Sequence, residues 1–229
     1  SFQISKECVQ LLDNTSIDGV KEFISMSDYI QLIIPRYIDS NLDSVLSESK
    51  IPMIQTNTGN CHIYVDEHID FETALSIIIN AKCSRPAACN SCECLLIHES
   101  IAESFLPILE KQLLLNNVII RCCPIAKEFM VCSDLATDID WSTSYKNLTL
   151  SIKVIPSIQD ACSHINMYGF KHTETVLSTN ETTIYYFSRH INAATVIVNA
   201  SPRFSDSGAF GFGLELAIST QTSKIRGPM

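Results

Sequence analysis

Cys89 is the residue of this chain whose surroundings are most typical of a nucleophile. It ends the run Ser84-Arg85-Pro86-Ala87-Ala88-Cys89, between an apolar helix-like stretch and an apolar strand-like stretch. Pro86 cannot continue a helix, so it predicts a turn between the two elements. A thiol on such a turn is exposed at the end of a sheet, where a substrate can reach it. On spacing alone, however, a buried thiol that acts as a small hydrophobe is the better interpretation of one cysteine among ten.

Other cysteines lie near Cys89 with a spacing that suggests metal ligands. The run consists of Cys83, Cys89, Cys92, Cys94 and His98. A structural zinc site needs a second pair of ligands on a turn. The next pair, Cys122-Cys123, is adjacent in sequence and falls at a strand end, where both thiols cannot easily face one metal. We therefore expect no metal site in this chain.

Charge and composition exclude several classes of protein. The net charge of −9 repels phosphate backbones, so we expect no nucleic-acid partner. The hydrophobic fraction of 46% and the charged fraction of 18% indicate a packed core rather than a disordered chain. No apolar run approaches the roughly 18 residues of a membrane span. The start, Ser1-Phe2-Gln3-Ile4, has no basic, apolar leader, which predicts reduced thiols in a cytoplasmic protein.

Apolar runs alternate with amphipathic stretches, and this alternation predicts a parallel α/β architecture. Strands are expected at residues 9–12, 29–34, 51–54, 62–65, 94–98, 118–122, 151–155, 173–177 and 195–199. Helices are expected at residues 16–25, 41–49, 70–82, 104–115, 157–168 and 180–188. The tail from Ser201 is rich in glycine and serine and is expected to line a site. The chain enters on a strand and ends without a closing element, so we expect it to be a piece of a longer protein.

Four segments, in order, carry a resemblance to a known family. They are Gly59-Asn60-Cys61-His62-Ile63-Tyr64-Val65-Asp66-Glu67, then Asn80-Ala81-Lys82 with Arg85-Pro86 and Cys89-Asn90, then Val198 to Phe204, and Phe210-Gly211-Phe212-Gly213. Together they resemble the γ-glutamyl phosphate reductases of the aldehyde dehydrogenase superfamily, and the resemblance covers the whole chain. The ordered set reverses the interpretation of Cys89 as an ordinary core thiol.

The resemblance implies an aldehyde dehydrogenase-like α/β fold. Residues 1–66 would be the C-terminal part of a Rossmann-like cofactor domain, and residues 67–204 would be the catalytic domain. Residues 205–229 would lead to the oligomerisation region. The full-length protein would then be a homo-oligomer that acts on a small molecule.

The implied activity is the NADPH-dependent reduction of L-glutamyl 5-phosphate to L-glutamate 5-semialdehyde in proline biosynthesis. The Cys89 thiolate would attack the acyl carbon and expel phosphate. A thiolate is stabilised by nearby positive charge, and Arg85 is the only cation in the immediate segment. Hydrolytic relatives in the superfamily use a glutamate to activate water. The matching stretch here, residues 55–60, holds no carboxylate, as suits a reductase.

The resemblance also assigns further site residues. Arginine binds carboxylate or phosphate through two parallel hydrogen bonds, so an arginine and hydroxyl groups on a loop after a strand suit the substrate. The expected substrate-binding residues are Arg85, His172, Asn199, Ser201, Arg203 and Phe204. The expected cofactor-binding residues are Pro35, Arg36, Phe210 and Gly211.

One departure from the family concerns the cofactor. The family has two glycines and a lysine after Pro35-Arg36, where backbone amides at a helix start can hold a pyrophosphate. This chain has Tyr37-Ile38-Asp39, so weaker NADPH binding is expected. Because the family's first half is missing, the 229-residue chain alone is expected to be inactive. Two alternatives remain: the reductase half of a bifunctional pyrroline-5-carboxylate synthase, or a catalytically silent relative that acts as a binding or structural module.

Overall fold

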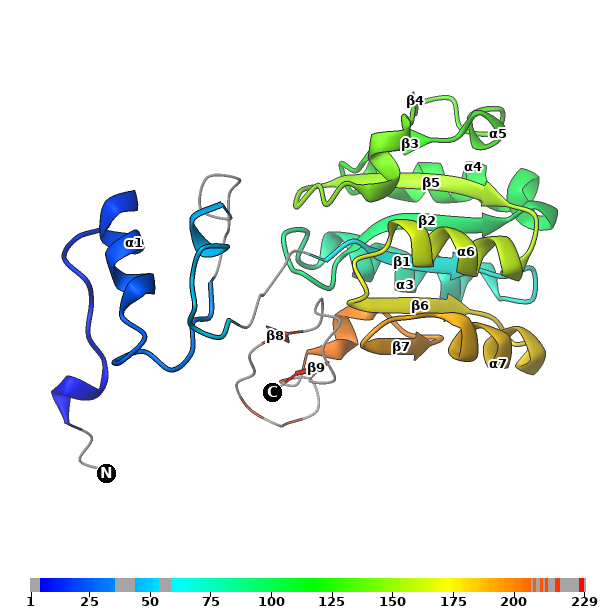
Figure 1. The fold of residues 1–229 in the computed structure, drawn as a ribbon. Helices are drawn as coiled ribbons and strands as arrows, with labels where there is room; N and C mark the ends of the chain where they lie inside the picture. The colour runs from blue at the N-terminus through cyan, green and yellow to red at the C-terminus, as the bar shows by residue number, and fades with distance from the viewer. Residues whose placement is uncertain are drawn as a thin grey trace. The chain divides into compact units, whose positions relative to one another are not determined.

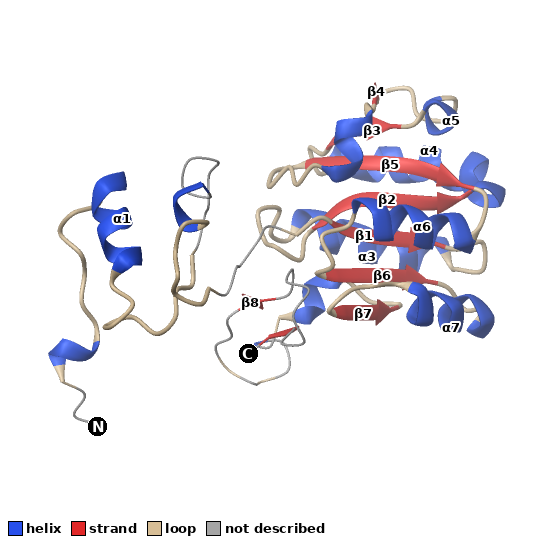
Figure 2. Ribbon diagram, in the orientation of Figure 1, coloured by secondary structure: helices blue, strands red, loops and turns tan. Residues whose placement is uncertain are grey.

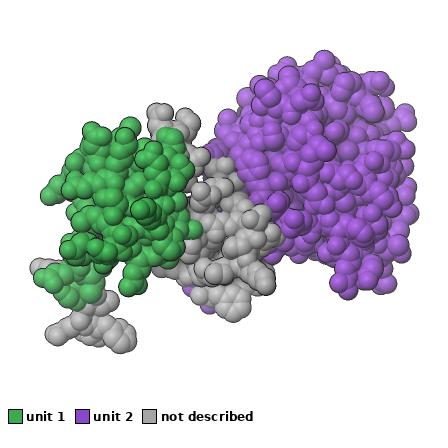
Figure 3. Space-filling model, viewed as in Figure 1, with its two compact units in different colours: residues 1–56 green, residues 57–229 purple. Residues whose placement is uncertain are grey.

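The computed structural model describes residues 5–35, 44–53 and 59–206, together with a few positions beyond residue 207. The chain divides into two compact units, residues 1–56 and residues 57–229 (Figure 3). Within the described ranges, no helix combines the length and the apolar character needed to cross a membrane.

The second unit is built on a seven-stranded parallel sheet in the order β4-β3-β5-β2-β1-β6-β7 (Figure 1). The strands are β1 (Cys61–Val65), β2 (Cys92–His98), β3 (Ile119–Cys122), β4 (Asp134–Leu135), β5 (Thr149–Ile155), β6 (Thr173–Leu177) and β7 (Thr195–Val198). A further antiparallel pair joins β8 (Ala217–Ile218) to β9 (Gly227–Pro228). The parallel α/β class predicted from the alternation of elements is confirmed.

Helices cover both faces of this sheet. They are α3 (Phe71–Cys83), α4 (Glu99–Leu115), α5 (Pro124–Lys127), α6 (Ile158–Tyr168) and α7 (Glu181–His190), with short 3-10 helices η2 (Asp138–Ser142) and η3 (Pro202–Ser205). Figure 2 shows α3 and α4 behind the sheet and α6 and α7 in front of it. The central strands are therefore buried on both sides, and every residue of β1 is buried.

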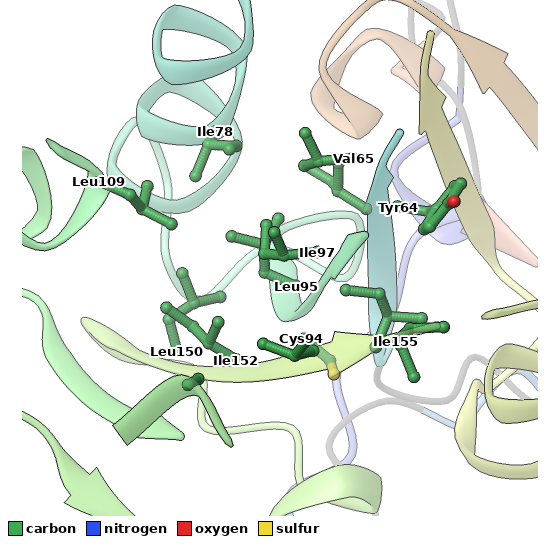
Figure 4. Close-up of a cluster of buried hydrophobic side chains, with 14 of the residues drawn as sticks. Tyr64, Val65, Ile78, Cys94, Leu95, Ile97, Leu109, Leu150, Ile152 and Ile155 are labelled. Carbon is green, nitrogen blue, oxygen red and sulfur yellow. The ribbon is translucent and has the colours of Figure 1, made fainter. Parts of the chain in front are cut away.

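The hydrophobic core is densest between the sheet and the pair α3 and α4. Leu95 and Ile97 of β2 point toward this side, where Ile78 and Leu109 also lie (Figure 4). Each fully buried aliphatic side chain of this kind contributes about 1.5–3 kcal/mol. The Cys94 sulfur points away from Leu95 and Ile97, because successive residues of a strand face opposite sides (Figure 4).

The first unit is small. It contains η1 (Lys6–Cys8), α1 (Ile17–Ser25), a helical turn at residues 44–46 and one parallel bridge between Ile33 and Met53. The Ser16 hydroxyl caps α1 by accepting a hydrogen bond from the Gly19 N–H at 3.1 Å. The buried core of this unit consists of Ile24, Ile33, Val45, Leu46 and Ile51.

Two expectations need correction. The strand predicted at residues 9–12 is wrong: no strand forms there and Leu11 is 93% exposed, because no segment among the described residues pairs with it. Helix α4 begins at Glu99 rather than at 104, since the His98 ring accepts a hydrogen bond from the Ser100 N–H and caps it. The two compact units divide near residue 56, and β1 pairs with β2 and β6 inside the sheet of the second unit; the domain boundary expected at residue 66 stays a prediction.

Other boundaries match well or fall only partly within the described ranges. Strand β6 coincides with the predicted residues 173–177, and α1, α3, α6 and α7 lie within two residues of their predicted ends. The predicted strand at 29–34 is reduced to the bridge at Ile33. Of the helix expected at 41–49, residues 41–43 lie outside the described residues, and so does residue 54 of the strand expected at 51–54.

Candidate active site

Cys89 lies on the turn between α3 and β2, as the sequence predicted. Two backbone hydrogen bonds of 3.0 Å shape the turn, from the Ala88 N–H to the Arg85 carbonyl and from the Ser91 N–H to the Ala88 carbonyl. The Cys89 side chain is partly exposed. Because the turn leads directly into β2, it lies at the amino end of that strand.

Two residues contact the backbone of the turn: Gly59, which precedes β1, and Cys61, which begins it. The Cys61 thiol donates a hydrogen bond to the Cys89 carbonyl at 3.4 Å. A Cβ added to Gly59 would lie 1.6 Å from the same carbonyl oxygen, so only glycine fits there. Gly59 belongs to the stretch 55–60, which holds no carboxylate. Residues 55–58 lie outside the described residues.

A buried ion pair links α3 to β2, the two elements that flank the Cys89 turn. Lys82, at the end of α3, contacts Glu93, at the start of β2, with 2.6 Å between Nζ and Oε2, and both side chains are almost fully buried. The other Glu93 oxygen accepts hydrogen bonds from the Lys146 N–H at 3.1 Å and the Ser144 hydroxyl at 3.3 Å. Burial raises the pKa of Glu93, and the Lys82 charge opposes that rise. The two ends of the turn are thus held together.

Asn90 connects the Cys89 turn to η3. Its buried side-chain amide donates hydrogen bonds to the Ser205 hydroxyl at 3.0 Å and to an Asp206 carboxylate oxygen at 2.9 Å. The Arg203 guanidinium binds the other Asp206 oxygen at 2.7 Å. The Ser201 hydroxyl caps η3 by accepting a hydrogen bond from the Arg203 N–H at 3.3 Å. The residue after the predicted nucleophile therefore organises the predicted substrate loop.

The structure brings four predicted substrate residues to this turn. Ser201, Arg203 and Phe204 belong to η3 or its cap, and Phe204 is half exposed. His172 joins them indirectly: its Nδ1 lies 2.9 Å from the Thr173 hydroxyl, which donates to the Ser205 hydroxyl at 3.1 Å. Their roles in binding substrate remain predictions.

Asn199 lies apart from this arrangement. The Asn199 side chain bonds both the N–H and the carbonyl of Ser178, at 2.9 and 2.8 Å. Ser178 follows the carboxyl end of β6, whereas Thr173 begins that strand, and five residues of strand span about 16 Å. Asn199 therefore ties β6 to β7 away from the Cys89 turn. Arg85 is exposed on the turn itself.

The predicted cofactor residues are only partly described. Gly211 has a positive φ of 76°, and a Cβ placed on it would meet nothing within 4 Å, so its backbone is open to close approach. Pro35 is buried. Arg36, Phe210 and the departure at 37–39 lie outside the described residues.

The cysteines differ in exposure and acidity. All ten, each within the described ranges, are thiols rather than disulfides. Burial raises the pKa of Cys162 to about 11, and it also raises the pKa of Cys61, Cys83, Cys92 and Cys122. These five thiols are poor nucleophiles at neutral pH because the thiolate is the reactive form.

The structure brings together a different group of possible metal ligands from the one that the sequence suggested. Among the described residues, one set of metal-ligating side chains has its donor atoms within 4.8 Å of one another: His62, Cys94 and His164. It shares only Cys94 with the run from Cys83 to His98. The two histidines come from β1 and α6, which sequence spacing did not connect.

Comparison with known proteins identifies the relatives of this chain. The gamma-glutamyl phosphate reductase of Alkaliphilus oremlandii is 44% identical over 227 residues, which is 99% of this chain and 54% of that protein. This chain is homologous to gamma-glutamyl phosphate reductase. It spans about half the length of the curated relatives it matches. No protein-family model matches it.

Solved structures agree with this homology. The gamma-glutamyl phosphate reductase of Thermotoga maritima superposes with a TM-score of 0.92 at 41% identity, over 99% of this chain and 55% of the other. A propionaldehyde dehydrogenase from Clostridium phytofermentans superposes with a TM-score of 0.63 at 20% identity, over 88% of this chain and 53% of the other. The second likeness shows the fold alone, and it confirms the predicted aldehyde dehydrogenase-like architecture.

Several supporting residues were not assigned a role from the sequence. Lys82 and Glu93 form the buried ion pair, and Asn90 bridges the turn to η3. A signal for them was present, because a lysine and a glutamate within otherwise apolar stretches are almost never buried unless they are paired.

Proposed function

We propose that this chain carries the nucleophile of an NADPH-dependent reductase that converts L-glutamyl 5-phosphate to L-glutamate 5-semialdehyde in proline biosynthesis. The observation that carries the proposal is the Cys89 turn. Its thiol is partly exposed, and its backbone is held by Gly59, Cys61 and the Lys82–Glu93 pair. The homology to gamma-glutamyl phosphate reductase supplies the reaction class.

In this reaction the Cys89 thiolate attacks the acyl carbon of the mixed anhydride. The carbon–oxygen bond to phosphate breaks, inorganic phosphate leaves and a thioester forms. NADPH, when bound, supplies the hydride that reduces this thioester. The carbon–sulfur bond then breaks, the aldehyde leaves and the thiolate is restored.

The residues around the turn hold the reacting groups in place and take no part in the bond changes. Asn90 fixes η3 relative to Cys89, and Asp206 links Arg203 to Asn90, the residue that follows the nucleophile. Asp206 occupies one guanidinium nitrogen of Arg203, which leaves further N–H groups for a substrate carboxylate or phosphate. Holding reacting groups in place before the reaction lowers its entropic barrier.

The nucleophile can be tested by alkylation. We expect brief treatment of the full chain with iodoacetamide at neutral pH to label Cys89 before Cys132 and Cys8, although both of these are exposed. Peptide mapping by mass spectrometry reads out the sites. Faster labelling of Cys132 would show that exposure alone sets the reactivity and would remove the assignment of Cys89.

The activity is tested on the full-length gene product, because the 229-residue chain alone is expected to be inactive. Glutamate 5-semialdehyde should reduce NADP⁺ only when phosphate is present, which is the reaction in reverse. Cys89→Ser should abolish this rate, whereas Cys83→Ser, at the partly buried thiol six residues earlier, should retain it. Loss of activity in both variants, or phosphate-independent turnover, would contradict the proposal.

A further inference from the structure

Two strands and one helix bring His62, Cys94 and His164 together in the interior of the second unit. His62 on β1 and Cys94 on β2 are register partners in the parallel pairing, so their side chains leave the same face of the sheet. Helix α6 packs against that face and contributes His164, whose Nε2 lies 3.9 Å from the Cys94 sulfur. The three donor atoms lie within 4.8 Å of one another, and all three residues are buried.

The Nε2 side of the buried His62 ring faces the other two donor atoms. Its Nδ1 lies 3.1 Å from the Asn60 carbonyl and 3.3 Å from a Glu174 oxygen, and both groups are acceptors. Nδ1 therefore donates the proton that it carries. Burial lowers the pKa of His62, but the Cys94 sulfur and the Glu174 carboxylate raise it to about 10, so a cation at Nε2 would replace a proton. His62 is fully buried, and no hydrogen-bond partner for its Nε2 is found among the described residues. This atom faces Cys94 and His164 and is available to a cation.

Glu174 completes the arrangement typical of metal sites. A ligating histidine usually donates its other ring N–H to a carboxylate or a backbone carbonyl, and His62 has both. The Cys94 thiolate and the Glu174 carboxylate together supply two negative charges, which matches a divalent ion. Magnesium and calcium need oxygen ligands, whereas two imidazoles and one thiolate suit zinc.

We propose that His62, Cys94 and His164 bind one zinc-type divalent cation, with Glu174 as the carboxylate behind His62. Three protein ligands leave one coordination position for a water molecule. The site is separate from the Cys89 chemistry and does not depend on the proposed function. It revises the expectation that the chain holds no metal.

Lys153 opposes the cation and gives the proposal a sharp test. Its ammonium lies 3.3 Å from Nδ1 of His164 and can only donate, so the ring proton of His164 lies on Nε2, and a metal must displace that proton against the nearby positive charge. The same ammonium lies 5.1 Å from the centre of the Trp141 ring, which offers it an alternative position. Removing this charge should therefore strengthen metal binding.

Cobalt(II) titration of the full chain measures the site directly, because a cobalt–thiolate bond gives a charge-transfer band in the near ultraviolet. We expect the band to saturate at one cobalt per chain and to be displaced by zinc. Cys94→Val and His164→Gln should abolish it. Cys92→Val and His190→Gln are the matched controls and should keep it. Circular dichroism confirms the fold of each variant.

Two further variants keep the test informative if Cys94→Val fails to fold. Glu174→Gln should weaken cobalt binding by about tenfold to hundredfold, as outer-shell carboxylates do. Lys153→Met should tighten it by roughly tenfold, since one unit charge is removed nearby. Absence of the band in the unaltered chain, its survival in His164→Gln, or unchanged affinity in Lys153→Met would each overturn the proposal.

Discussion

At the scale of single residues, the position of Cys89 depends on Gly59, because only a residue without a side chain fits beside the Cys89 carbonyl. Gly59 precedes β1 and lies against the Cys89 carbonyl, and it is this close approach, rather than an unusual φ, that requires glycine. The sequence places the two residues thirty positions apart. Their contact follows from the pairing of β1 with β2, which sets both strand starts side by side.

Gly59→Ala should displace the Cys89 turn and destabilise the fold by about 1–3 kcal/mol, as overpacking of a close contact does. The added methyl group would lie 1.6 Å from the Cys89 carbonyl oxygen, so the backbone must move. Urea unfolding and the rate of Cys89 alkylation measure the two effects. Gly208→Ala is the control, because nothing lies within 4 Å of a Cβ there. Equal behaviour of the two variants would contradict the argument.

At the scale of elements, periodicity located most helices and strands of the second unit, because apolar runs and amphipathic stretches alternate clearly there. It failed at residues 9–12, an apolar run that pairs with no segment of the described chain. It also missed α5, β4 and η2, which are too short to show a period. Of the candidate site, Cys89 followed from the family resemblance. Asn90 and the Lys82–Glu93 pair required the tertiary structure, because their partners come from other elements.

Lys82→Met should destabilise the second unit by about 3–5 kcal/mol, because it leaves the buried Glu93 charge without its partner. The double variant Lys82→Met, Glu93→Gln should recover much of this loss, since the glutamine still accepts from Ser144 and the Lys146 N–H. A double-mutant cycle by urea unfolding measures the coupling. Simple additivity of the two single losses would mean that the pair does not hold the turn.

Asp140 should make stability depend on pH through η2. Burial raises the pKa of Asp140. Hydrogen bonds from Thr137 and Tyr145 and the charge of Arg121 lower it by more, so the net shift of this pKa is downward. A depressed carboxyl pKa stabilises the fold above the unfolded value of about 3.9, and this stabilisation is lost as the pH falls through the folded value.

Asp140→Asn should therefore cost about 1.5–3 kcal/mol at pH 7, typical of hydrogen bonds to a charged group. The difference from the unaltered chain should shrink steadily below about pH 4. Asp138→Asn, at an exposed position in the same 3-10 helix, is the control and should change little. A destabilisation that stays constant down to low pH would show that packing, rather than the charge, is responsible.

At the scale of the whole molecule, the two units differ in what holds them together. Among the described residues, five buried hydrophobic side chains form the core of the first unit, whereas a continuous core fills both faces of the seven-stranded sheet in the second. Ordering each residue costs about 1–2 kcal/mol of conformational entropy, so a small core offsets only a short stretch of chain. The first unit lies within residues 1–66, the predicted part of a Rossmann-like cofactor domain, and it is the less stabilised of the two units.

Hydrogen exchange should separate the two units. Amides of α1 should exchange through openings of low free energy, whereas those of β1 and β2 should exchange only on global unfolding of the sheet. Mass spectrometry of exchanged peptides, followed over increasing urea, gives the free energy of each opening. The α7 helix serves as the internal comparison, because it is similar in length to α1 but packs on the large core through Phe187. Equal protection of α1 and α7 would show that the first unit is stabilised by contacts beyond its own five buried residues.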